Sequence, residues 1–284
     1  MNLDLRIGGI RFRIDCGSEI ICEESFAPFF CTSKNVSDVN ITFTHDYSQI
    51  SKPDSTMLGE DLLMEYYRHD GRLLTMAKGS KGSHLSCCVS SSDDHVCHLN
   101  FAPGGGVNTL GGLLRLVPIR QILLKHGVLF LHASQIAVGN TGILFSAPSG
   151  TGKTTQARLW HKFRNAELLC NDRTLTDGEN TYGYPFDGSE PVCCGEVRRL
   201  GAIVTLEQAP ENSIHRLKPR EALARLMPQA VIDVWDPHSR TAAAELLLTL
   251  LTRTPVYLLR CSPDENAVAC LEQQLMKDGV INHE

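Results

Sequence analysis

The sequence predicts an α/β protein in which a domain of alternating strands and helices on a mixed sheet follows an N-terminal region rich in β-strands. Two observations predict this class. A loop of small residues at 146–155 lies between an apolar strand at 142–145 and a helix, and strand and helix patterns alternate after it. Residues 1–100 show mostly β patterns. The run Ala-Pro-Gly-Gly-Gly separates the two, so we expect a β-rich region at 1–100 and a second domain at 106–284.

Residues 1–15 are predicted to form a β-hairpin, because apolar residues alternate on both sides of Gly8 and Gly9. Polar, turn-rich stretches occupy 46–65 and 78–83. Further strands are predicted at 39–43, 72–76, 84–89 and 95–99. We expect a small antiparallel β region that binds a partner or covers the second domain.

Residues 109–126 have the apolar spacing of one helix, kinked at Pro118 and ended by Gly127. A strand at 128–138, a tight turn and the strand at 142–145 then form a hairpin that enters the loop. In the ordinary mononucleotide-binding fold a parallel crossover precedes such a loop, so the hairpin predicts a mixed sheet.

After the loop, a short strand at 166–170 ends at the triplet Asn-Asp-Arg, and a hairpin follows at 174–184. Residues 185–192 are expected to form a loop. Further strands are predicted at 202–206, 213–217 and 255–260, and helices at 221–226, 241–252 and 264–277.

The amino-acid composition argues against two classes of partner, nucleic acids and membranes. The chain of 284 residues has 27 Lys and Arg against 32 Asp and Glu, a net charge of −5, and no basic block interleaved with aromatics. A nucleic-acid partner is therefore not expected. The first residues lack the apolar core of a signal peptide, and no apolar run reaches the ~18 residues of a membrane span. We expect a cytoplasmic protein without a membrane partner.

Eleven cysteines without a Cys-x-x-Cys pair are interpreted as reduced thiols, several of them packed as small apolar residues. The alternative is a metal site. It would use Cys87, Cys88, His95, Cys97 and His98. Their spacing does not match that of a zinc ribbon, so reduced thiols are the favoured interpretation.

The loop at 146–155 has the residues that hold a phosphate group. Gly150 and Gly152 allow successive backbone N–H groups to turn toward one point, and the following helix adds the positive end of its dipole. Lys153 is expected to bridge the terminal phosphates, and the Thr154 hydroxyl to ligate Mg²⁺. The expected nucleotide-binding residues are Ser149, Gly150, Thr151, Gly152, Lys153, Thr154 and Thr155. The alternative is a Gly-rich turn before an amphipathic helix. The combination of strand, lysine and double threonine favours a nucleoside triphosphate.

Four segments together resemble the HPr kinase/phosphorylase and phosphoenolpyruvate carboxykinase superfamily, and within it the HPr-kinase-related proteins of bacteria. The segments are Leu-His-Ala-Ser at 131–134, Ser-Gly-Thr-Gly-Lys-Thr-Thr at 149–155, Asn-Asp-Arg at 171–173 and Glu-Val-Arg-Arg-Leu-Gly at 196–201. The resemblance covers about residues 110–275. It implies a mixed-sheet P-loop kinase domain that uses ATP and Mg²⁺ to phosphorylate a hydroxyl, namely serine in a peptide, a protein or the free amino acid. It also implies a homo-oligomer.

The same resemblance suggests catalytic residues. Asp172 leaves its strand at the edge of the sheet that holds the loop, so it is expected to bind Mg²⁺ or to act as the general base. His132 is expected to orient that carboxylate, and Arg198 to face the γ-phosphate. In the HPr kinases an acidic pair divides the metal and base roles. Here the first member is Asn171, so Asp172 covers both roles or a water fills one.

Each of these residues also has a structural interpretation. His132 is alternatively a buried core residue, Asp172 a turn cap and Arg198 a surface charge. Glu190 is interpreted as an exposed loop carboxylate, and Trp235 as a packing residue beside a helix cap.

Two function classes stay open. The first is an ATP-dependent kinase with Lys153 and Asp172 in its active site. The second is a catalytically silent nucleotide-binding regulatory module, because Asn171 stands where the family has an acid. The chain is too short for a decarboxylating carboxykinase, and it lacks the Asn-Lys-x-Asp segment of a GTPase.

Overall fold

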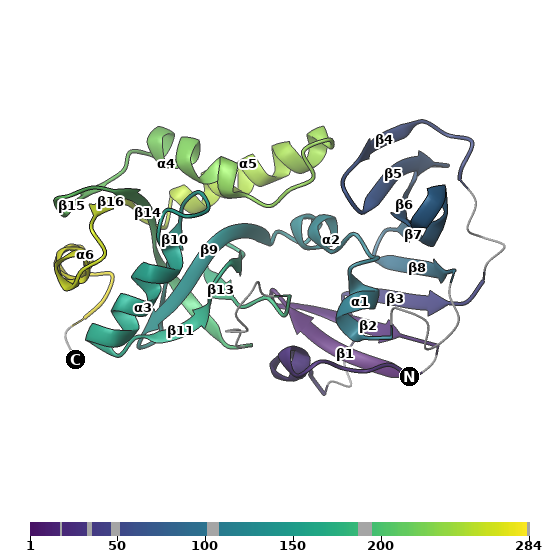
Figure 1. Ribbon diagram of the computed structural model, residues 1–284, viewed down its shortest axis with the longest axis horizontal. Coiled ribbons are helices and arrows are strands. Elements are labelled where there is room, and N and C mark those ends of the chain that lie inside the picture. Colours follow the sequence, from purple (N-terminus) through teal and green to yellow (C-terminus); the bar gives the residue numbers. More distant parts are fainter. Residues whose placement is uncertain (18, 33–35, 47–51, 101–107, 187–194, 283–284) are drawn as a thin grey trace. The chain divides into compact units, whose positions relative to one another are not determined.

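The computed structural model describes residues 1–17, 19–32, 36–46, 52–100, 108–186 and 195–282. It contains two compact units. Unit 1 comprises Met1–Ile122 and Asp233–His238, and unit 2 comprises Leu123–Ile232 and Ser239–Glu284. Helix α2 (Ile119–Lys125) carries the chain from the first unit to the second (Figure 1). The glycine run expected to separate two domains lies outside the described residues. Within the described ranges, no helix combines the length and apolar character needed to cross a membrane.

Unit 1 contains an eight-stranded sheet in the order β1-β2-β3-β8-β7-β6-β5-β4. Its strands are β1 (Asn2–Ile7), β2 (Ile10–Asp15), β3 (Val39–Thr44), β4 (Met57–Glu60), β5 (Met64–His69), β6 (Arg72–Lys78), β7 (His84–Ser91) and β8 (Asp94–Leu99). The predicted N-terminal hairpin is confirmed by the antiparallel pairing of β1 with β2. Strand β4 and the first two residues of β5 lie in the stretch at 46–65 that is predicted to be polar and rich in turns. In β5 the adjacent Tyr66 and Tyr67 are both buried, so no alternation of apolar and polar residues marks the strand.

The prediction of an antiparallel region is wrong at the centre of this sheet. Strand β3 pairs in parallel with β2 on one side and with β8 on the other. A long connection, which includes the 3-10 helix η1 (Glu24–Phe29), separates β2 from β3. A connection of this kind can return the chain to the side of the sheet where β2 began, which a hairpin turn cannot do. The sheet is therefore mixed.

The single helix predicted at 109–126 is two helices, α1 (Leu110–Leu114) and α2. The Thr109 hydroxyl caps α1 by accepting a hydrogen bond from the Gly112 N–H at 3.1 Å. The expected kink at Pro118 is a complete interruption, because proline lacks an N–H and its ring clashes with the preceding helical turn.

A short segment from late in the chain, 233–238, belongs to unit 1. The Trp235 ring stacks on Tyr66 with ring centroids 4.4 Å apart, so the predicted packing role of Trp235 is confirmed. The buried Asp233 carboxylate forms an ion pair with Arg120 at 2.8 Å. Stacking and a buried ion pair thus attach this segment to the first unit.

Unit 2 contains the second mixed sheet, so the α/β class predicted for the chain is confirmed. Its strands are β9 (Leu129–Val138), β10 (Thr141–Ser146), β11 (Glu167–Cys170), β12 (Arg173–Thr176), β13 (Asn180–Tyr182), β14 (Val197–Gln208), β15 (Ser213–Arg216) and β16 (Val256–Cys261). The predicted hairpins β9-β10 and β12-β13 are present. Strand β10 also pairs in parallel with β14, which pairs in parallel with β16. The pairings β10-β9-β12-β13-β14 return to β10 and close a ring of strands.

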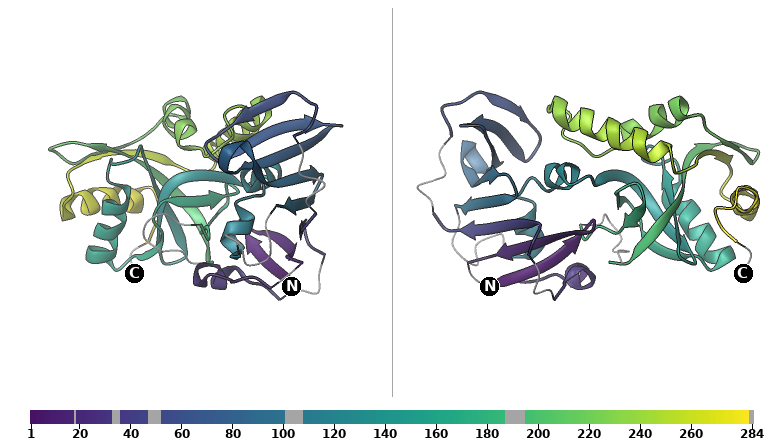
Figure 2. Two further views of the ribbon diagram at one scale, coloured as in Figure 1. Left: turned by 45° about the vertical axis from the view of Figure 1, so that its right-hand side comes forward. Right: turned by 180° about the vertical axis from the view of Figure 1, so that it is seen from behind.

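Helices cover both faces of this sheet (Figures 1 and 2). They are α3 (Lys153–Arg164), α4 (Pro219–Leu226), α5 (Pro237–Leu251) and α6 (Glu265–Lys277). Ile143 and Phe145 of β10 face the core that contains α3 and α6, whereas Leu144 faces the core that contains α4 and α5. This alternation follows from the two-residue repeat of a strand. Two apolar cores therefore hold β10, and with it the start of the following loop, from both sides.

Candidate active site

The ends of several strands of unit 2 meet at one edge of its sheet. Strand β10 ends at Ser146, which pairs with Ala133 of β9 and with Thr205 of β14. Strand β14 ends at Gln208, which pairs with Cys261 at the end of β16. Because β10, β14 and β16 are parallel, this is their carboxyl edge, where open α/β sheets generally bind ligands.

The loop between β10 and α3 has the backbone that the sequence predicts. Gly150 has a φ of +78° and Gly152 a φ of +117°. A Cβ atom at either position would meet nothing within 4 Å. Glycine is therefore needed at both positions for backbone conformation and not for space. Helix α3 begins directly afterwards at Lys153. The backbone N–H groups of its first turn, which have no partner within the helix, therefore lie where this loop ends.

Lys153 is buried beneath this loop. Its Nζ atom donates hydrogen bonds to the backbone oxygens of Ala147 at 2.9 Å and Pro148 at 3.3 Å. Burial lowers the pKa of the Lys153 ammonium, and the nearby Asp172 carboxylate partly opposes that shift. Lys153 and Asp172 therefore lie near enough for their charges to interact, although they come from different connections of the sheet.

Asp172 and His132 form a hydrogen-bonded pair at the same edge. His132 Nε2 lies 2.8 Å from Asp172 Oδ1, and Arg173 Nε lies 3.5 Å from Oδ2. Backbone and side-chain bonds fix both residues, because Ala133 N donates to Asp172 O and Ser146 Oγ donates to His132 O. The Asp172 side chain is nevertheless 37% exposed. A held but accessible carboxylate therefore lies beside the loop between β10 and α3.

The neighbouring Asn171 differs in exposure, since it is buried. Its backbone oxygen accepts a hydrogen bond from Ser134 Oγ at 2.5 Å. The carboxylate of Asp172, and not the amide of Asn171, is thus the more accessible of the two adjacent polar groups.

The structure does not bring Arg198 to this edge. Arg198 lies at the start of β14. The next residue, Arg199, pairs with Thr141 at the beginning of β10. At a strand rise of ~3.3 Å per residue, Thr141 is about 17 Å from Ser146. The Arg198 guanidinium instead pairs with Glu167 at 2.8 Å and with Glu196. Strand β14 begins earlier than the sequence pattern indicates, and this extension places Arg198 at the opposite edge of the sheet.

The side chains of Thr154 and Asp172 suit a magnesium ion better than they suit a metal ion that is coordinated by protein side chains alone. Among the described residues, no three His, Cys, Asp or Glu side chains gather closely enough to hold a metal ion, and this includes the cysteines and histidines between 87 and 98. Magnesium usually keeps several waters and binds through one or two protein groups plus substrate phosphates. The hydroxyl of Thr154, in the first turn of α3, and the carboxylate of Asp172 fit that pattern. Glu190 lies outside the described residues.

A cavity of about 620 Å³ opens beside the loop, and the sequence did not indicate it. It is lined by the glycines of the loop, by Thr155 and Gln156 of α3, and by the residues that end β14 and β16. Gln208 Nε2 donates to the backbone oxygen of Gly150 at 3.3 Å and so links β14 to the loop. Because β10 lies between β9 and β14, the cavity and the His132–Asp172 pair flank the loop on opposite sides.

No protein-family model matches this chain, and no curated protein sequence matches it. The resemblance to the HPr kinases therefore depends on the motif residues alone.

Proposed function

We propose that unit 2 is an ATP- and Mg²⁺-dependent phosphotransferase that phosphorylates a hydroxyl group, namely serine in a peptide, a protein or the free amino acid. One observation carries the proposal. A glycine-containing loop with a buried lysine lies at the same sheet edge as a histidine-bound, accessible carboxylate. Phosphoryl transfer needs a phosphate cradle, charge neutralisation and a group that takes the proton of the acceptor, and these residues supply each of them.

In this proposal each residue has a defined task. The backbone N–H groups at Gly150–Gly152 and the start of α3 hold the phosphate oxygens, and Lys153 leaves the loop carbonyls to neutralise the terminal phosphates. Thr154 and Asp172 would hold Mg²⁺, which would supply further neutralisation of phosphate charge. Asp172 accepts the proton of the acceptor hydroxyl while the acceptor oxygen bonds to the γ-phosphorus and the bond to the β,γ-bridging oxygen breaks. His132 is a positioning residue that holds the carboxylate.

A nucleotide-binding module without transfer is the second candidate. Its support is Asn171, which replaces an acid of the family pattern and is buried. The same loop would then bind nucleotide to change the behaviour of the protein, and Asp172 would only hold magnesium.

The test is phosphate transfer from Mg-ATP to a panel of acceptors that includes free serine and serine-containing peptides. Replacing Asp172 with Asn should lower turnover by about 10²- to 10⁴-fold, the usual contribution of a general base, and should leave the melting temperature near that of the wild type. The matched control is Glu245→Gln, which changes an exposed carboxylate on α5 to the amide. Equal turnover by the wild type and Asp172→Asn would remove Asp172 from the mechanism. Nucleotide binding without transfer to any acceptor would favour the module.

A further inference from the structure

Two buried thiols lie directly opposite each other in the sheet of unit 1. Strands β7 and β8 form an antiparallel hairpin in which Cys88 pairs with Cys97, and neither residue is exposed to solvent. Side chains of directly paired residues project from the same face of a sheet, so the two sulfur atoms lie on one face of this hairpin. In the described part of the chain, no other two cysteines are paired in this way across neighbouring strands.

The hydrogen-bond pattern of the hairpin sets the distance between the strands at this pair. The Asn100 N–H donates to the Leu85 backbone oxygen at 2.7 Å, so these two residues form a hydrogen-bonded pair. Hydrogen-bonded and non-hydrogen-bonded pairs alternate along an antiparallel ladder, and Cys88 with Cys97 is three pairs further on. It is therefore a non-hydrogen-bonded pair, in which the Cα atoms are about 4.5 Å apart and the side chains are closest. That separation lies within the ~4.4–6.8 Å that a disulfide spans.

The neighbours of Cys88 favour its thiolate form. A hydrogen bond from the Cys97 thiol lowers the pKa of the Cys88 thiol, His95 adds to this effect, and burial opposes it. His95 is itself buried, and its Nδ1 atom lies 2.9 Å from Ser90 Oγ, which holds the ring in place. Burial raises the pKa of the Cys97 thiol, so that residue keeps its proton. A thiolate is the nucleophilic form of cysteine, and here a second thiol lies next to it.

The adjacent Cys87 has a different environment. Its side chain lies on the opposite face of the sheet, in an apolar cluster that includes Met76. Its register partner in β8 is His98. Burial raises the pKa of the Cys87 thiol to about 11. Cys87 is therefore next to Cys88 in the chain but has neither the cross-strand thiol nor the lowered pKa, which makes it a matched control.

We propose that Cys88 and Cys97 are an oxidation site of unit 1, at which hydrogen peroxide links β7 to β8 through a reversible disulfide. The Cys88 thiolate attacks one peroxide oxygen, the O–O bond breaks, and the leaving hydroxide takes up the proton released by Cys88 to become water. The Cys97 sulfur then attacks the sulfur of the Cys88 sulfenic acid, the S–O bond breaks, and the Cys97 proton leaves with the hydroxide as a second water. Two thiols thus lose two electrons, and one peroxide is reduced to two waters.

Burial of both thiols restricts the oxidant. Hydrogen peroxide is little larger than a water molecule, and it reaches the thiols when the hairpin opens locally. The disulfide then opposes further opening, because it joins two strands in the middle of the sheet. Oxidation is therefore expected to make this part of unit 1 more rigid, whatever the function of unit 2.

The test is treatment of the intact chain with hydrogen peroxide, followed by alkylation of the remaining thiols in urea and mass spectrometry. Cleavage at Asp93 and Asp94 separates the two cysteines unless they are linked. The wild type should yield a pair of peptides linked through Cys88 and Cys97. Amide hydrogen exchange in β7 and β8 should slow about tenfold after oxidation, and dithiothreitol should restore the original rate.

Cys87→Ala is the matched control and should form the linked peptides as the wild type does. Cys88→Ala should form no link between Cys87 and Cys97. If either variant does not fold, the wild type still decides, because fragmentation of the linked peptides distinguishes Cys87 from Cys88. Three results would overturn the proposal: Cys88 and Cys97 recovered as free thiols after the more exposed Cys22 is oxidised, either thiol linked to another cysteine, or unchanged hydrogen exchange in the linked chain.

Discussion

Each unit contains a carboxylate paired with a histidine, and the two pairs differ in their surroundings. In unit 1, His84 Nε2 lies 3.0 Å from Glu65 Oε2, and the two side chains are 15% and 16% exposed. In unit 2, His132 Nε2 lies 2.8 Å from Asp172 Oδ1, and these side chains are 29% and 37% exposed. The hydrogen-bond distance is thus similar in the two pairs, whereas the Asp172 carboxylate is more accessible to a ligand than the Glu65 carboxylate.

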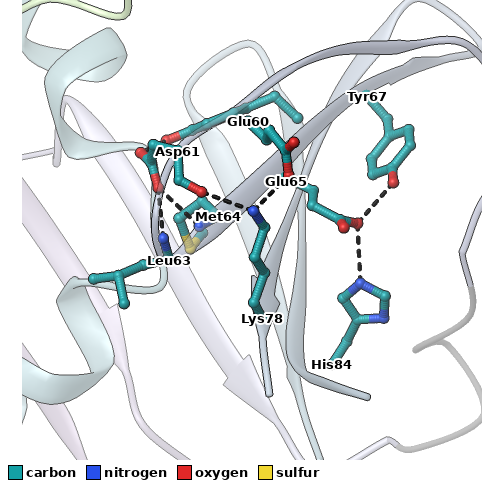
Figure 3. Close-up of polar contacts among 9 residues, drawn as sticks. Glu60, Asp61, Leu63, Met64, Glu65, Tyr67, Lys78 and His84 are labelled. Carbon is teal, nitrogen blue, oxygen red and sulfur yellow. Dashed lines mark hydrogen bonds and ion pairs between the residues drawn. The ribbon is translucent and has the colours of Figure 1, made fainter. Parts of the chain in front are cut away.

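The neighbours of Glu65 are those of a structural group. The Tyr67 hydroxyl donates to Glu65 Oε2 at 2.7 Å, and this bond, opposed by burial and aided by His84, holds the pKa of the carboxyl below its usual value. Figure 3 shows Glu65 between Tyr67 and His84, while the Lys78 ammonium bonds to Glu60 and to the Asp61 backbone oxygen. Glu65, Glu60 and Lys78 are therefore each bonded to a polar partner within unit 1.

Asp172 has a different environment, because the glycine loop between β10 and α3, with its buried Lys153, lies beside it. A carboxylate–histidine pair therefore indicates chemistry only where a ligand site adjoins it. We expect changes in the Asp172 pair to lower activity and changes in the Glu65 pair to lower stability.

The largest effect expected from the comparison concerns the lysines near each pair. Lys153→Met removes a charged donor to the phosphates and should weaken Mg-ATP about 100-fold, since hydrogen bonds to charged groups contribute about 1.5–3 kcal/mol. Lys52→Met is the control, because Lys52 lies over the Tyr67 ring in unit 1, 5.7 Å from its centroid. Calorimetry measures both affinities. Equal weakening by the two variants would show that the loss is not specific to the loop.

The histidines provide the next test. His132→Asn should lower turnover about tenfold, because the Asp172 carboxylate loses the hydrogen-bond partner that positions it. The melting temperature should stay close to the wild-type value. His84→Asn should do the reverse, with unchanged turnover and a lower melting temperature. If both variants lose stability and neither loses activity, the two pairs are equivalent and the distinction drawn between them is wrong.

The smallest effect concerns Glu65 and pH. Because the folded-state pKa of Glu65 is lowered, its contribution to stability is complete above the unfolded-state pKa of about 4.3 and is lost as the pH falls through the folded-state value. Glu65→Gln should therefore cost about 1 kcal/mol at pH 7 and less at pH 3. Urea unfolding at both pH values measures this difference. The same cost at both would mean that the carboxylate charge does not stabilise unit 1.

Local sequence signals were sufficient for the loop and for the residues next to it. Gly150 and Gly152, which are expected to turn successive backbone N–H groups toward one point, have positive φ values, and α3 begins at Lys153. The hairpin that carries His132 and the strand that ends before Asp172 were also predicted, and the two side chains meet. The loop, the hairpin and the strand depend on residues close in the chain, on backbone preferences and on the alternation of apolar residues. The meeting of His132 with Asp172 depends instead on the pairing of β9 with β12.

Pairing between strands that are far apart in the chain decided the features that the sequence alone did not predict. The parallel pairing of β3 in unit 1 and of β14 with β16 in unit 2 joins segments far apart in the chain, and no local pattern encodes which strands become neighbours. The length of β14 placed Arg198 away from the loop, and the common carboxyl edge of β14 and β16 created the cavity lined by Gln156. The sequence by itself determined the glycine loop, the strand that carries His132 and the strand that ends before Asp172, because these arise from local backbone preferences and apolar alternation. The tertiary structure decided what flanks them, because strand order and register are set by packing across the whole unit.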